Sequence, residues 1–210
     1  MIKKEILEFM HHAEKLKHVL RHSWLSNGMQ ESAAEHSWRM SLMAMMMADK
    51  VEHKIDLCKA LKMIIVHDIA EAEAGDVPAF MHKERAEVKK LEKESIEKIK
   101  EKYKDPAFNE ICELWLEYEE GKTPEAIFVK ALDKIEVRIQ HNEADIKTWI
   151  DVEYPRSQFV SDRFCEHDKF LKEFNELVKE ESKNKIIKES AKDFDEILKE
   201  VEELRHSDKE

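Results

Sequence analysis

Residues 57–74 read LCKALKMIIVHDIAEAEA, and this stretch decides our interpretation of the fold. Its apolar residues recur with helical spacing. Asp56 before it suits a helix N-cap, and Gly75 after it suits a helix end. The apolar run MIIV leads directly into His67 and Asp68. Polar groups on a buried helical face need partners. The stretch therefore predicts a core helix that carries two chemically active side chains.

The rest of the chain is predicted to be helical as well. Only three glycines and four prolines interrupt its 210 residues. A polar connection, RHSWLSNGMQE, separates the first two helices, and Ser32 with Glu35 forms a capping box. We expect an all-α fold with a single domain over residues 1–210, core motifs at about 16–145 and a helical extension at about 155–205. The predicted helices cover residues 3–20, 32–49, 57–74, 82–102, 106–120 and 125–149, with one or two more after Pro155.

Composition excludes several classes of protein. The formal net charge of −11 argues against broad nucleic-acid binding, which needs a basic surface. The three cysteines stand in no CxxC pair, which is typical of reduced thiols. No stretch is long and apolar enough to span a membrane. We therefore expect a cytoplasmic protein without a nucleic-acid or membrane partner. The methionine-rich stretch at residues 40–47 is interpreted as buried core rather than as a copper site.

Four polar residues interrupt apolar helical faces, namely His36, His67, Asp68 and Asp133. A metal ion would satisfy all four together, and this mixed N/O set suits Mn, Fe, Co, Ni or Zn. Open positions for water and substrate would make the site catalytic. Glu71 follows Asp68 by three residues and His67 by four, so one continuous helix would place all three on one face. The sequence predicts one divalent transition metal.

Each of these residues also has a plain structural interpretation. A lone His on a helix is more often a satisfied polar residue, and an Asp near a lysine is usually a surface ion pair. The chain holds a second pair, His167 and Asp168, in polar surroundings and without partner ligands at suitable positions. We predict a structural role for that pair, because a metal site needs several converging ligands.

The ordered pattern H…HD…D resembles the HD-domain phosphohydrolase superfamily, and the wider motifs resemble its 5′-deoxynucleotidase branch. The resemblance spans about residues 16–142. It implies a helical bundle with a metal site in the helix core. It also implies hydrolysis of 2′-deoxyribonucleoside 5′-monophosphates to deoxynucleoside and phosphate. The motifs are Arg21 with Trp24, Ser-x-x-Glu-His at residues 32–36, VHDIAEAEAGD at 66–76 and FVKALDKIE at 128–136.

The same resemblance implies further site residues. Glu71 would orient or deprotonate the attacking water, and Asp76 would lie beside that water or the leaving 5′ oxygen. Arg21 would hold the phosphate and Trp24 the nucleoside, although residues 22–23 separate this pair where some family members have it adjacent. The plain alternatives are an exposed helix residue for Glu71, a turn former for Asp76, a helix C-cap for Arg21 and a core side chain for Trp24.

Two rival functions stay open at this point. The nearer is another HD phosphohydrolase activity, on a nucleoside triphosphate, an alarmone or a cyclic nucleotide. Few basic residues lie near the motifs, which mildly favours a monophosphate. The other is a non-enzymatic helical interaction protein with a structural metal, which would require neither Glu71 nor Asp76. Family members commonly self-associate, so we expect a homodimer, with apolar surface offered by residues 111–118 or by the region after Pro155.

Overall fold

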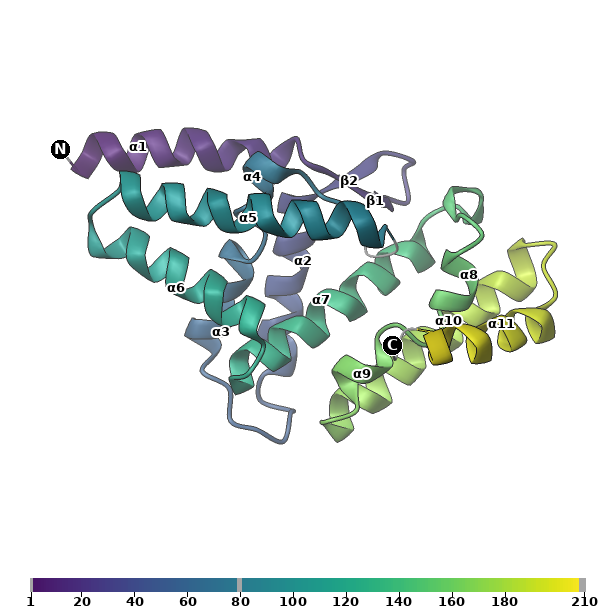
Figure 1. Ribbon diagram of the computed structural model, residues 1–210. Coiled ribbons are helices and arrows are strands. Elements are labelled where there is room, and N and C mark those ends of the chain that lie inside the picture. Colours follow the sequence, from purple (N-terminus) through teal and green to yellow (C-terminus); the bar gives the residue numbers. More distant parts are fainter. Residues whose placement is uncertain (1, 79–80, 208–210) are drawn as a thin grey trace. The chain divides into compact units, whose positions relative to one another are not determined.

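The computed structural model describes residues 2–78 and 81–207 (Figure 1). Its contacts divide the chain into two compact units. The first unit takes in residues up to 22, 30–49 and 53–130, and the second unit takes in residues 23–29, 50–52 and those from 131 onward. The structure is helical apart from one two-stranded sheet, which confirms the predicted all-α fold class.

Helices make up most of the first unit. Strand β1 (Leu20–Trp24) and helix α7 (Pro124–Glu143) each begin in it and continue in the second unit. The remaining elements of the first unit are α1 (Ile2–Ala13), the 3₁₀ turn η1 (Glu14–Lys17), β2 (Gln30–Ser32), α2 (Ala33–Met47), α3 (Leu57–Val66), α4 (Glu71–Ala74), α5 (His82–Lys102) and α6 (Pro106–Glu120). The second unit adds the 3₁₀ turn η2 (Ile146–Thr148), α8 (Glu153–Arg156), α9 (Asp162–Cys165), α10 (Lys169–Glu189) and α11 (Phe194–Ser207).

The predicted helix caps are confirmed where the sequence carried a cap signal. Ser32 and Glu35 form the complete capping box at the start of α2. Asp56 accepts a hydrogen bond from the Lys59 amide at the start of α3. Asp105 accepts one from Ala107 at the start of α6, and Gly121 ends that helix with a left-handed φ of 63°. Capping satisfies backbone groups that a helix end leaves open, so these ends follow from local chemistry.

The first predicted helix, residues 3–20, is wrong in its second half. Helix α1 ends at Ala13, and the supposed polar connection forms the hairpin of β1 and β2. The Ala33 amide donates to the Val19 carbonyl at 3.0 Å, which uses a backbone group that a continuing helix would need. At the tip, Leu25 N donates to Met29 O at 2.7 Å and Gly28 has a φ of +84°. Pairing between β1 and β2 therefore takes the place of the predicted helix, in a region where the sequence has no helix-capping residue.

The helix over residues 57–74 is interrupted. It divides into α3 and α4, and the residues between them form tight turns in which Ile69 N donates to Val66 O and Glu71 N donates to Asp68 O. His67 and Asp68 lie in this break rather than inside a continuous helix. Such turns follow 3₁₀ spacing, which nearly superimposes side chains three residues apart. Asp68 and Glu71 consequently still share a side, for a different reason from the one predicted.

The methionine-rich stretch is buried on one face only. Met40, Ala44 and Met47 lie in the interior of the first unit, which confirms part of the predicted core. The opposite face of α2 is exposed and carries Trp38, Leu42, Met45 and Met46. Residues 111–118 of α6, one of the surfaces expected for self-association, are half buried, and Leu116 is exposed. Their buried side chains are Cys112, Leu114, Trp115 and Tyr118.

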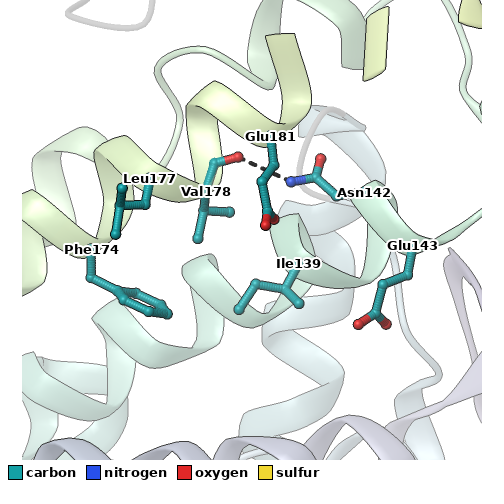
Figure 2. A pocket seen from close by; sticks show the side chains of 7 residues that line it. All are labelled: Ile139, Asn142, Glu143, Phe174, Leu177, Val178 and Glu181. Atoms are coloured by element: carbon teal, nitrogen blue, oxygen red, sulfur yellow. Dashed lines mark hydrogen bonds between the residues drawn. The ribbon is translucent and has the colours of Figure 1, made fainter. Parts of the chain in front are cut away.

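The second unit has its own apolar core. The long predicted helix ends at Glu143 rather than at residue 149, and the turn η2 follows. Between α7 and α10 runs a groove of about 490 Å³, and Asn142 Nδ2 donates to Val178 O across it (Figure 2). None of the predicted site residues lines this groove. The core side chains are Ile146, Trp149, Tyr154, Phe159, Ile186, Ile197 and Val201. Within the described residues, no helix is long and apolar enough to cross a membrane.

Asp168 has a structural role, as predicted for the second His-Asp pair. Its side chain is buried and accepts from the Leu171 amide at 2.9 Å, which caps α10. The same carboxylate accepts from the Glu52 amide at 2.7 Å and so ties the loop at residues 50–52 to this helix. Both partners belong to the second unit.

We expect Asp168→Ala to lower the free energy of unfolding by about 2–3 kcal/mol, because it removes a cap and leaves a buried amide without its acceptor. His167→Ala, which changes an exposed neighbour, should stay within about 0.5 kcal/mol of wild type. Urea unfolding measures both. Metal content should be the same in all three proteins, and its loss in Asp168→Ala would restore this pair as a metal site.

Candidate metal centre and active site

Two buried imidazoles lie side by side in the first unit. His36 projects from the buried face of α2, three residues into the helix that the capping box begins, and His67 caps the end of α3. Their ring centroids are 5.5 Å apart, and a nitrogen of one lies within 4.8 Å of a nitrogen of the other. Packing of α2 against α3 sets this approach. The spacing allows both rings to contact one small ion.

The tautomer of His67 is set by its backbone. Nδ1 lies 2.7 Å from the Ile64 carbonyl oxygen, which can only accept, so Nδ1 carries the proton. In a neutral ring this leaves the lone pair on Nε2, which lies 3.1 Å from Asp68 Oδ1. A lone pair facing a carboxylate oxygen at this distance is repulsive unless a proton or a cation stands between them. A ligating His commonly donates its other N–H to a carbonyl in this way, so the donor set fits a metal ion.

Glu71 is a half-buried acidic side chain beside these groups. Its Oε2 is enclosed and has no hydrogen-bond partner among the described residues. Burial raises the pKa of the Glu71 carboxyl well above its ordinary value, and the charges of Asp68 and Asp76 raise it further, against the lowering effect of Arg21. Gly75, with a φ of 75°, turns the chain after α4, and the charge of Asp76 then lies close enough to Glu71 to affect its pKa. The alternative of an exposed Glu71 is wrong, and a raised pKa suits a proton-transfer group.

Arg21 lies between two carboxylates of the first unit. Its Nη1 is 3.3 Å from Asp68 Oδ2, and its Nε is 3.6 Å from Glu31 Oε2. Gln30 Nε2 donates to the Arg21 backbone carbonyl at 2.8 Å, which fixes the strand that carries it. Because Arg21 lies in β1 and not at a helix end, the alternative of a helix C-cap is wrong. The guanidinium is mostly buried and held from two sides.

Glu31 was missed by sequence reasoning. Its side chain is almost fully buried, and a carboxylate oxygen lies within 4.8 Å of a nitrogen of His36. In the sequence it is one polar residue among several in MQES, directly before the capping serine, and nothing there marks it. Only the hairpin, which turns Arg21 back beside residues 30–32, reveals it. Its acid-rich surroundings also fit a cation, since Glu31, Asp68, Glu71 and Asp76 gather around Arg21 and the two imidazoles.

Two predicted site residues belong to the second unit. Asp133 is buried on α7, and its Oδ2 lies 2.8 Å from Lys134 Nζ. Glu136 follows one helical turn later and is fully buried. Trp24 is half-buried, and its backbone carbonyl accepts from Gln140 Nε2 at 2.7 Å. The structure thus gathers His36, His67, Asp68, Glu71, Asp76 and Arg21 within the first unit, whereas the roles of Asp133 and Trp24 stay predictions.

Comparison with known proteins places this arrangement in a family. A family model described as an HD domain matches residues 13–174. "5′-deoxynucleotidase HDDC2" of Dictyostelium discoideum is 37% identical over 145 residues, which is 65% of this chain and 76% of the relative. The human protein of that name is 34% identical over 142 residues, which is 67% of this chain and 68% of the relative.

The fold is also that of a solved structure, a "Predicted metal-dependent phosphohydrolase" from Magnetospirillum magnetotacticum MS-1. The TM-score is 0.72 at 24% identity, over 85% of this chain and 93% of that one. The chain therefore belongs to the HD-domain family, in the branch whose curated members are named 5′-deoxynucleotidase.

Proposed function

We propose that this chain is a metal-dependent 5′-deoxynucleotidase that hydrolyses 2′-deoxyribonucleoside 5′-monophosphates to a deoxynucleoside and phosphate. The observation that carries the proposal is the His67–Asp68 pair, whose facing atoms are 3.1 Å apart and suit a shared cation, with Arg21 3.3 Å from the same aspartate. The names of the curated relatives supply the substrate class.

The proposed metal ligands are His36, His67, Asp68 and Asp133. The first three lie together in the first unit, and Asp133 is a buried carboxylate on α7. This set of two imidazoles and two carboxylates suits one divalent transition ion, namely Mn, Fe, Co, Ni or Zn. When bound, such an ion polarises a phosphoryl oxygen and makes a nearby water more acidic.

The proposed chemistry assigns a task to each remaining site residue. Glu71 accepts the proton of the water that attacks phosphorus, and its raised pKa places it closer to working pH. The bond from phosphorus to the 5′ oxygen then breaks, and the leaving oxygen takes up one proton, so that one water is consumed for each deoxynucleoside and phosphate formed. Asp76 lies on the side of that oxygen or of the water. Arg21 presents a planar fork that matches phosphate geometry. Trp24 offers an indole face for the nucleoside.

The rival functions are less consistent with these residues. A structural metal clip requires no carboxyl such as Glu71, whose Oε2 has no hydrogen-bond partner among the described residues. A triphosphate would add negative charge where Asp68 and Glu31 already flank Arg21. A phosphate-release screen over deoxyribonucleoside and ribonucleoside mono- and triphosphates, run with metal analysis, tests the proposal. Release from triphosphates alone would reject the monophosphatase.

Further parts of the proposal concern the setting of the enzyme. We propose one HD domain over residues 1–210, since the family model spans parts of both units. A cytoplasmic location agrees with the free thiols of Cys58, Cys112 and Cys165. The net charge of −11 disfavours a nucleic-acid partner. We also propose a homodimer.

Asp133→Ala should lose most of its metal, because a catalytic site with few protein ligands depends on each one.

Glu71→Gln should keep the metal and lose about 10²- to 10⁴-fold in kcat, the usual scale for a positioned base. Glu73→Gln changes an exposed acid of the same short helix and should leave both quantities unchanged. Metal analysis and steady-state kinetics decide. Normal turnover in metal-loaded Glu71→Gln would remove its assigned role.

Arg21→Lys keeps the charge but not the planar fork, so both kcat and KM should worsen while metal content stays near wild type. Glu31→Gln keeps the shape but removes the charge that holds Arg21 Nε. It should weaken kcat/KM by about tenfold through misplacement of the guanidinium. Kinetics and melting temperature are measured on the same samples. A lower melting temperature with unchanged kcat/KM in both variants would place Arg21 outside catalysis.

A further inference from the structure

Helix α2 presents an apolar stripe to solvent. The side chains of Trp38, Met45 and Met46 are 67%, 62% and 64% exposed, and Leu42 lies between them at 45%. Residues spaced by four, seven and eight positions share one side of a helix. The opposite side packs into the first unit through Met40, Ala44 and Met47. The helix is therefore apolar on both sides, whereas the outer face of a surface helix is ordinarily polar.

This stripe contrasts with the rest of the chain. Charged residues make up 40% of the sequence, yet residues 40–48, MSLMAMMMA, contain none. The four side chains expose on the order of 500 Å² of largely apolar surface, which is at the upper end for a monomer and typical of a contact site. Ile65, near the end of α3, is 63% exposed as well. Because the rings of His67 and His36 are 5.5 Å apart, the end of α3 that carries Ile65 lies next to the beginning of α2.

A second copy of this chain fits the stripe better than an unrelated partner. The exposed apolar area approaches the roughly 800 Å² per partner of a standard interface. Each copy carries a net charge of −11, and residues 40–48 carry no charge that a second copy would oppose. Flexible thioethers adapt to an identical surface, and an exposed Trp is a common interface anchor.

The ends of the stripe are complementary in charge. Arg39, Leu42 and Met46 are spaced by three and four residues along α2, and Asp49 lies in the turn directly after the helix, so Arg39 and Asp49 stand near opposite ends of the stripe. In an antiparallel pairing around a two-fold axis, Arg39 of each copy faces Asp49 of the other. An isologous contact repeats this pair twice.

We propose that the exposed face of α2 is the homodimer interface and that two copies pack their α2 helices antiparallel through Trp38, Leu42, Met45 and Met46. The inference rests on the proposed homodimer. It favours α2 over residues 111–118, whose only large exposed apolar side chain among the described residues is Leu116.

Light scattering on the full chain at micromolar concentration should show a dimer for wild type. Met45→Glu inserts a charge into the stripe and should raise the dimer dissociation constant by about 30-fold or more. Leu177→Glu is the matched control, because Leu177 is 66% exposed on α10 and lines the groove of Figure 2. It should remain dimeric. Far-UV circular dichroism and phosphate release confirm that each variant is folded.

The possible failures are distinguishable. A monomeric wild type overturns both the homodimer and its interface. A dimer that survives Met45→Glu overturns the interface and leaves the homodimer standing, and loss of the dimer in Leu177→Glu alone moves the contact to α10. The pairing direction has its own test, in which Arg39→Glu weakens the dimer and Arg39→Glu with Asp49→Arg restores it. Failure of the double variant to restore association overturns the antiparallel arrangement.

Discussion

The separation of 3.1 Å between His67 Nε2 and Asp68 Oδ1 constrains everything around it. These are neighbouring residues in a tight turn, and the Ile64 carbonyl fixes the His67 tautomer, so the ring presents a lone pair to the carboxylate. A proton or a cation between the two atoms removes the repulsion. Arg21 supplies part of the positive charge at 3.3 Å, and a divalent ion fits the remainder.

Much of the fold could be predicted because local chemistry determines it. The caps at Ser32, Asp56 and Asp105 and the end at Gly121 depend on residues within one turn, and each is confirmed. Two of the three failures share a cause. The hairpin after α1 and the break after Val66 depend on backbone hydrogen bonds that no cap residue announces. Helical spacing over residues 57–74 therefore predicted correctly that Asp68 and Glu71 share a side. It predicted the wrong backbone conformation for residues 67–70, which form turns and not helix.

The candidate site shows the same division. His36, His67 and Asp68 were predicted from their positions on apolar helical faces, and Glu71 and Asp76 from the family resemblance; all five lie in the first unit. Glu31 was not predicted, because its burial and its contact with Arg21 arise only when the hairpin folds back. A single carboxylate that pairs with one arginine leaves no periodic signal in the sequence. Glu31 is identified only in the folded structure, where its buried carboxylate pairs with the Arg21 guanidinium.

The break between α3 and α4 also bears on the order in which the site forms. The turn at residues 67–70 closes through contacts between near neighbours, and loops this short form far faster than distant contacts. His67, Asp68 and Glu71 can thus be arranged while the chain is still largely open. His36 requires α2 to dock, and the proposed ligand Asp133 requires closure of a much longer loop. A nascent site of this kind captures an ion weakly at first and more tightly with each docking step, so that metal capture and folding proceed together.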